Sequence, residues 1–327
     1  MKDLSEMKAV RSPSALHEEI RKVDYQKYGL LFALVLLCCL FSILSPVFLT
    51  QQNILNVLNQ TSINAILAIG VTFVILIGGI DLGLGSYVAL TGCVAALFAQ
   101  GGNYPVFIPI LAGIGAGLLI GLINGVVITR GRLASFIVTL GMMTIARGIS
   151  LVVSGGRPIS NLSDSFNYIG GGVLFHIPLP ILIVIVIFIA TYILLSKTTH
   201  GRYIYAVGGN DEAARTSGIH INRVKLAAFT LCGGLAGLAG VIQASRITTG
   251  QPNIGVGYEL DAIAAVVIGG TSLTGGIGRV SGTIIGVMII GVINNGLDLM
   301  NVSSYYQQII KGLIIICALL LDRKSKQ

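Results

Sequence analysis

The sequence predicts an all-α polytopic membrane protein, on the evidence of its composition, its glycine content and its recurring apolar segments. Hydrophobic residues make up 54% of the 327 residues, only 10% are charged, and the mean hydropathy is +0.87. About a quarter of the residues in a soluble domain are charged, so the composition excludes that class. The 43 glycines suit closely packed membrane helices, because small residues let helix backbones approach in lipid.

Apolar segments long enough, or nearly long enough, to cross a bilayer follow one another after residue 27. They predict about ten transmembrane helices near 28–45, 60–79, 84–100, 106–128, 134–153, 178–196, 225–244, 259–272, 281–297 and 307–321. The segment 259–272 is short and ends in a glycine-rich stretch, so it either crosses fully or forms a half-helix or re-entrant break. We expect one transmembrane domain, residues 28–322, with a loop at 197–225 and tails at 1–27 and 323–327.

Ten spans place both termini on the same side of the membrane. The two tails, the turn with Arg130 and Arg132, the loop 197–225 and Arg279 then share this side and hold most of the 21 Lys and Arg residues. The positive-inside rule makes this side cytoplasmic. Arg157 and Arg246 are the basic residues left in outer loops.

Sequence motifs for nucleotide, metal or nucleophilic chemistry are missing. The stretch from Gly275 to Val280 is the nearest match to a Walker A loop, but it lacks Gly-Lys-Ser/Thr. The cysteines show no paired spacing and the histidines form no cluster with carboxylates or thiols. We expect no catalytic residue, no metal site and no cofactor on this chain, and the net charge of +8 indicates membrane topology rather than nucleic-acid binding.

Residues 200–225 form a charged island between apolar segments, where a membrane protein meets a soluble partner. Asn210 can cap a helix, Asp211 and Glu212 fall in its first turn, and Gly218 can take the left-handed position after its last turn. These residues predict a helix of about two turns, roughly 10 Å long. A helix this short is marginal alone in water, so we expect it to pack against its own membrane helices or a partner.

Uncharged polar residues inside the apolar segments are candidates for a solute pathway, because lipid makes polar groups costly unless they face a partner or a wet cavity. The candidates are Asn64, Thr139, Thr144, Asn294 and Asn295, and Asn124 and Gln243 share their character. A path lined by such groups suits a neutral, hydroxyl-rich solute. The alternative is that these side chains only form hydrogen bonds between helices.

Several charged residues lie inside or beside the apolar segments. We expect Asp81, Glu259 and Asp261 at helix ends or caps, because a charge at mid-span costs about 2.5–3.5 kcal/mol. Arg147 falls within the fifth segment and must reach a carbonyl, a carboxylate or the membrane interface. For Arg246 the sequence leaves two roles open, an internal salt bridge with Glu259 or a contact with a partner.

Glycines also recur at four-residue spacing, which places each set on one helix face. The sets are Gly113, Gly117, Gly121 and Gly125; Gly278, Gly282 and Gly286; and Gly233 with Gly237. For each set we expect helix packing within one subunit rather than a dimer seam. In addition, Gly78-Gly79 and Gly269-Gly270 look like corresponding helix breaks of an internal repeat.

The stretch Glu212-Ala213-Ala214 followed by Gly218 resembles the EAA loop of ABC importer permeases, a cytoplasmic helix that docks on the ATP-hydrolysing subunit. Segments 59–70, 76–86, 201–219, 258–279 and 294–312 are also similar to the permease subunit of ribose-type monosaccharide ABC importers. The resemblance covers about residues 28–323. It implies the type II ABC importer permease fold, with about ten transmembrane helices in a bacterial inner membrane.

The resemblance further implies a homodimer, a partner ATPase with tandem nucleotide domains that holds ATP and magnesium, and an extracytoplasmic sugar-binding protein. The ATPase-coupling residues would be Asp211, Glu212, Ala213, Ala214, Arg215 and Gly218. We also expect Arg157 and Arg246 to receive acidic groups of the binding protein. Ribose is the best single expectation, although permeases for galactose, arabinose, xylose and the quorum-signal sugar share many of these motifs.

Two other classes remain open from the sequence. An ion-coupled secondary transporter would need a coupling-ion site near the middle of the membrane, and the scarcity of carboxylates in the apolar segments counts against it. An ABC amino-acid permease of related fold would need a charge in its path to hold a charged amino acid, and Arg147 keeps that alternative open.

Overall fold

The structure is a computed structural model that describes residues 13–324 and, among these, the side chains of 28–314 and of residue 316. It is almost entirely helical. The elements are α1 (Pro13–Leu44), α2 (Gln51–Leu76), α3 (Leu84–Ala99), α4 (Phe107–Gly131), α5 (Ser135–Ser154), α6 (Asp164–Gly171), β1 (Val173–Leu174), β2 (Ile177–Pro178), α7 (Leu179–Lys197), α8 (Thr199–Gly209), α9 (Asp211–Thr216), α10 (Ile221–Arg246), α11 (Tyr258–Ile268), α12 (Val280–Leu299) and α13 (Ser304–Lys324).

Six of the described helices are long and apolar enough to cross a membrane, namely α2, α4, α5, α7, α10 and α12. Two shorter apolar helices accompany them, Tyr28–Leu44 within α1 and α3. This confirms a helical protein with several candidate membrane spans, and the count of ten spans stays a prediction. The segment predicted at 259–272 is the 11-residue helix α11, about 16 Å long and so too short to cross the hydrocarbon core alone.

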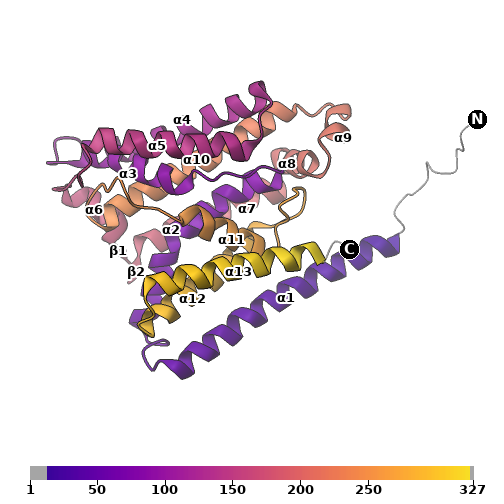
Figure 1. Ribbon diagram of the computed structural model, residues 1–327, viewed down its shortest axis with the longest axis horizontal. Helices are drawn as coiled ribbons and strands as arrows, with labels where there is room; N and C mark the ends of the chain where they lie inside the picture. The colour runs from indigo at the N-terminus through magenta and orange to yellow at the C-terminus, as the bar shows by residue number, and fades with distance from the viewer. Residues whose placement is uncertain (1–12, 325–327) are drawn as a thin grey trace, which may run out of the picture.

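The long helices lie side by side, and the molecule has two distinct ends (Figure 1). The helices α8 and α9 lie at one end, together with the start of α1 and the end of α13. The helix α6 and the β1–β2 hairpin lie at the other. We refer to these as the α9 end and the α6 end.

The helix α2 forms the centre of the bundle, and all residues from Ala65 to Leu76 are buried. Its sequence is apolar all round in this half, as expected for a helix enclosed on every side. It packs against α10, α12, α11 and α7. Thr72 Oγ1, near the end of α2, lies 2.9 Å from Thr283 Oγ1, near the start of α12. Near the other ends of the two helices, the side-chain amides of Asn53 in α2 and Asn295 in α12 exchange two hydrogen bonds of 2.9 Å. The two helices therefore run antiparallel.

The predicted glycine faces pack helices within the subunit. A Cβ on Gly117 would lie 2.3 Å from Gly233 O, and one on Gly121 would lie 2.2 Å from Phe229 O, so α4 and α10 touch through their backbones. A Cβ on Gly286 would lie 1.9 Å from Ala265 O, which joins α12 to α11 in the same way. Gly278 was wrongly placed on this face, because α12 begins only at Val280.

The predicted helix breaks have matching backbone geometry, shifted by one residue from the expected pairing. After α2, Gly78 takes a positive φ of 74°, and its N–H and that of Gly79 bond the carbonyls of Ile75 and Val74. After α11, Gly270 has a φ of 84°, and its N–H and that of Thr271 bond Val267 and Val266. Both are Schellman ends, so Gly78 corresponds to Gly270.

The α6 end carries structure that sequence reasoning did not predict. The helix α6 is anchored on α10 by Ser245, whose hydroxyl accepts from Gly170 N and donates to Phe166 O, both at 2.6 Å. Ile159 forms an isolated antiparallel bridge with Gly250, so the segments that follow α5 and α10 meet here.

Candidate functional site

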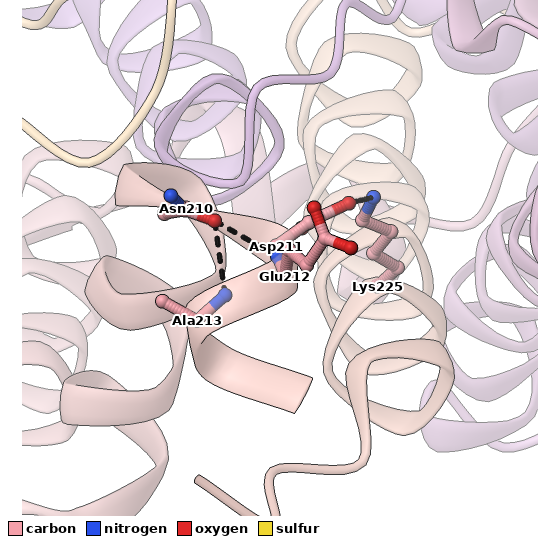
Figure 2. A network of polar contacts seen from close by, with 5 residues as sticks. All are labelled: Asn210, Asp211, Glu212, Ala213 and Lys225. Atoms are coloured by element: carbon pink, nitrogen blue, oxygen red, sulfur yellow. Dashed lines mark hydrogen bonds and ion pairs between the residues drawn. The ribbon is translucent and has the colours of Figure 1, made fainter. Parts of the chain in front are cut away.

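The helix α9 forms as the charged island predicts. Asn210 is its N-cap, and its side-chain oxygen accepts from the N–H groups of Glu212 at 2.9 Å and Ala213 at 3.0 Å (Figure 2). Asp211 in the first turn pairs with Lys225 of α10 (Figure 2), which fixes the helix against the start of α10. The helix is six residues long and therefore shorter than the two turns expected.

The end of α9 is a complete Schellman motif. Gly218 takes a φ of 82°, its N–H bonds Arg215 O at 3.0 Å, and the N–H of Ile219 bonds Ala214 O at 3.1 Å. Ala214 is the one buried residue of α9, with 3% of its surface exposed, whereas Glu212, Ala213 and Arg215 are exposed. The short helix therefore rests on Ala214 and presents its remaining side chains outward.

The helix α8 connects this exposed helix to the core of the bundle, and sequence reasoning did not predict it as a helix. A Cβ on Gly208 would lie 1.7 Å from Leu76 O, so α8 touches the last turn of α2 through its backbone. The same Leu76 carbonyl accepts from Gly276 N at 2.9 Å. Tyr205 donates to Gly278 O at 2.9 Å, and burial raises the pKa of this phenol, so it stays a protonated donor.

Both glycine breaks therefore meet at the α9 end, beneath α8. A Cβ on Gly275 would lie 2.8 Å from Gly78 N, which places the turn after α11 against the turn after α2. The helix α8 therefore contacts the segments through which the polypeptide leaves α2 and enters α12. The only sequence signal for these contacts was the recurrence of paired glycines, at Gly78-Gly79, Gly208-Gly209 and Gly275-Gly276.

The candidate pathway residues fall into two groups. In the first, Asn64 of α2 and Asn294 of α12 are partly buried, and the side-chain oxygen of each is buried without a hydrogen-bond partner among the described residues. Asn59 and Gln243 carry similar oxygens. A buried polar atom without a partner is costly, so these amides are the ones that a polar solute or water would satisfy.

The second group has protein partners or faces outward. Asn295 is 6% exposed and pairs with Asn53, which favours a role in helix packing. Thr139 is fully buried and holds the segment before α3, accepting from Leu82 N and donating to Ile80 O. Thr144 is exposed on α5. Asn124 belongs to both groups, because its NH2 group donates to the Tyr87 hydroxyl at 2.8 Å while its side-chain oxygen is buried without a hydrogen-bond partner among the described residues.

The charged residues within the bundle have identifiable environments. Arg147 donates to the carbonyls of Pro252 and Ile254, and so supports the irregular segment that leads into the half-helix α11. Asp261 lies in the first turn of α11 and pairs with Lys311 of α13. Asp81 is fully buried in the turn between α2 and α3, where Oδ1 accepts from Gly83 N. The acidic residues therefore lie at helix ends or in the turn between helices, as expected, and Arg147 reaches backbone carbonyls, one of the partners expected for it.

The two outer arginines lie at the α6 end. Arg157 is exposed in the segment that follows α5, two residues before Ile159. Arg246 is partly buried at the end of α10 and donates to Asn59 O at 3.3 Å. The ion pairs among the described side chains do not include an Arg246–Glu259 pair, and Glu259 Oε1 accepts from Gly257 N instead.

Comparison with known proteins assigns the class that this architecture suggests. Residues 53–319 match the family described as branched-chain amino acid transport system / permease component, and the chain belongs to this family of permease components. It is therefore a transport protein with several apolar helices suited to a membrane.

Curated relatives narrow the comparison. The ribose import permease protein of Bacillus subtilis is 48% identical over 302 residues, which are 92% of this chain and 94% of that protein. The ribose import permease protein of Escherichia coli K12 is 47% identical over 300 residues, 90% and 93% of the two chains. The D-allose transport system permease protein of E. coli K12 is 39% identical over 301 residues, 91% and 92%. The resemblance to ribose-type permeases is thus confirmed, while no solved structure matches the chain.

Proposed function

We propose that this chain is the transmembrane permease subunit of an ATP-binding cassette importer that translocates ribose. The single observation that carries the mechanism is the capped helix α9, whose exposed face lies above the Gly208–Leu76 contact between α8 and α2. Ribose is favoured because the ribose import permeases of Escherichia coli K12 and Bacillus subtilis are 47% and 48% identical to this chain, whereas the D-allose protein is 39% identical to it.

The proposed assembly is a homodimer in the bacterial inner membrane, with the type II importer fold and about ten transmembrane helices in each copy. The α9 end faces the cytoplasm, as do both termini. Basic residues support this orientation, since Arg130, Arg223 and Arg279 lie at the ends of α4, α10 and α12 that adjoin α8 and α9.

Each part of the site has a proposed role. The exposed face of α9, formed by Asp211, Glu212, Ala213 and Arg215 with Gly218, binds an ATPase that carries ATP and magnesium. Ala214 was expected on this face but is buried, so its role is to seat the helix on the bundle. Arg157 and Arg246 at the α6 end receive acidic groups of the sugar-binding protein. The solute passes uncharged amides, with Asn64 and Asn294 as the residues best placed to meet it.

Transport in reconstituted vesicles tests this proposal directly. The permease, its ATPase and its binding protein are reconstituted together, and uptake of labelled ribose, allose, arabinose and leucine is compared. Ribose uptake that requires ATP and persists after ionophores collapse ion gradients supports the proposal. Ionophore-sensitive uptake without ATP would indicate a secondary transporter instead. Uptake of leucine in place of ribose would support the amino-acid alternative, which the family description makes a specific competitor.

A further inference from the structure

An apolar groove with a basic rim opens at the α9 end, between α7, α8, α10 and α4. Its volume is about 410 Å³. The walls are formed by Leu122, Leu194, Ile204, Val224, Ala227 and Leu231. Two basic residues line it as well, Arg223 in the first turn of α10 and His200 in the first turn of α8. The proposed translocation and coupling roles use none of these residues.

The groove runs along helices suited to the membrane. Leu122 and Leu231 are 41% and 38% exposed, and they lie inside the candidate spans α4 and α10. Arg223 and Leu231 are eight residues apart on one helix, so the groove extends about 12 Å along α10 from its basic rim. Such a surface presents an apolar slot at the depth of acyl chains and a positive charge at the depth of headgroups.

The charge on the rim takes part in no ion pair among the side chains that the structure describes. Lys225 pairs with Asp211 and Lys311 with Asp261, and neither of these ion pairs between described side chains involves Arg223. Lys225 occupies the Asp211 carboxylate of α9, and the ion pairs between described side chains do not join Arg223 to Glu212, the other acidic residue of that helix. Both Arg223 and His200 are exposed and able to donate to an anion.

We propose that this groove binds one anionic phospholipid of the cytoplasmic leaflet, with an acyl chain along Ala227 and Leu231 and the phosphate at Arg223 and His200. This inference rests on the orientation given under the proposed function. The lipid fills the space between α8 and α10 and holds α8 in place against the bundle. Because α8 also carries the Gly208 contact with Leu76, the lipid supports the segment that joins α9 to the two helix breaks.

The test measures lipid binding on the purified permease–ATPase complex by native mass spectrometry. Dioleoylphosphatidylglycerol and dioleoylphosphatidylethanolamine are titrated separately. The wild-type complex should bind the anionic lipid more tightly, and Arg223→Gln should weaken its binding roughly fivefold, the usual effect of one basic residue near an anionic lipid. Arg223→Gln with His200→Gln should remove the preference between the two lipids. The matched control is Arg202→Gln, an exposed charge on α8 that does not line the groove.

A variant that fills the groove tests the apolar part separately. Ala227 is exposed, so Ala227→Phe should fold normally, elute as the wild-type complex does, and bind both lipids less well. Ala227→Leu gives a smaller obstruction should the larger side chain disturb folding. Displacement of the anionic lipid by glycerol phosphate, with Ala227→Phe having no effect, would indicate a simple anion site and overturn the proposal.

Two further outcomes are decisive. Unchanged lipid binding in both Arg223→Gln and Ala227→Phe overturns the proposal, and a loss of ATPase co-purification in these variants would assign the groove to the ATPase instead. The lipid titration requires no transport. A failure of ribose uptake with retained lipid preference would therefore contradict the proposed function and leave the lipid site standing.

Discussion

Lys311 Nζ of α13 lies 2.9 Å from Asp261 Oδ2 in the first turn of α11. Asp261 is only 7% exposed. This ion pair is a polar link between α13 and the half-helix, and it explains why a carboxylate is tolerated in this position. A buried pair adds little net stability, but removal of one partner leaves an uncompensated charge.

Lys311→Met should therefore destabilise the protein by about 3–5 kcal/mol, and Asp261→Asn with Lys311→Met should recover much of that loss. Thermal unfolding followed by size-exclusion chromatography measures both variants in the same detergent. A double variant no more stable than Lys311→Met would show that the pair does not compensate the buried charge.

Gly208→Ala should separate α8 from the last turn of α2, because its Cβ would lie 1.7 Å from Leu76 O. Gly209→Ala is the matched control, since a Cβ there meets nothing within 4 Å. We expect ATP-driven uptake to fall at least tenfold in Gly208→Ala and to stay normal in Gly209→Ala, with the ATPase bound to both variants. Equal uptake in the two variants would remove the Gly208 contact from the coupling path.

Glu212→Lys should abolish ATP-driven uptake by reversing the charge on the exposed face of α9, and Gly218→Val should do the same because a β-branched residue resists a φ of 82°. Asp164→Lys reverses a first-turn charge on the short helix α6 at the other end and serves as the control. Co-purification of the ATPase and uptake are measured together. Wild-type values for both in Glu212→Lys and Gly218→Val would contradict the coupling role.

The neighbours Asn294 and Asn295 should behave differently. Asn295→Leu removes both hydrogen bonds to Asn53 and leaves the buried Asn53 side-chain oxygen without its partner, although the Asn53 NH2 group keeps its bond to Phe48 O. The change should cost about 1–3 kcal/mol of stability. Asn294→Leu breaks no hydrogen bond of its side-chain oxygen, so it should lower sugar flux without lowering stability. Uptake rates and thermal unfolding of the two variants distinguish a role in the solute path from a role in helix packing. Normal flux in Asn294→Leu would assign both residues to helix packing.

Arg157→Glu should weaken docking of the sugar-binding protein without changing the stability of the permease, because Arg157 is exposed. Arg246→Glu should weaken docking and also lower the stability of the permease, since it removes the hydrogen bond to Asn59 O. The readout is sugar-stimulated ATPase activity against binding-protein concentration at two ionic strengths, which separates long-range charge effects. A half-saturating concentration and salt dependence that match the wild type in Arg157→Glu would argue against docking there.

The sequence was most informative where a property is local. The caps of α9 follow from Asn210 and Gly218, and the α4–α10 contact follows from glycines at four-residue spacing, because each pattern depends on neighbouring residues alone. The shortness of α11 was visible for the same reason, since Gly269 and Gly270 end the apolar run.

Long-range contacts were beyond such reasoning. Asn53 and Asn295 are 242 positions apart, and the sequence alone could not distinguish their mutual pairing from a lining of the solute path. The helix α6 was missed because its eight residues span only about two turns, too few for a periodic pattern to stand out, and its anchor Ser245 lies far along the chain. The helix α8 was missed because residues 199–209 lie in the charged segment that we interpreted as a loop between membrane helices.

The bond between Arg147 and Ile254 has a consequence for the synthesis of the protein. The two residues are 107 positions apart, and at about 5–20 residues per second the ribosome needs roughly 5–20 s to make the intervening chain. During this interval α5 exists with a guanidinium whose carbonyl partners have not yet been made. The nascent chain therefore depends on water, lipid headgroups or the insertion machinery to shelter Arg147 until the segment before α11 arrives.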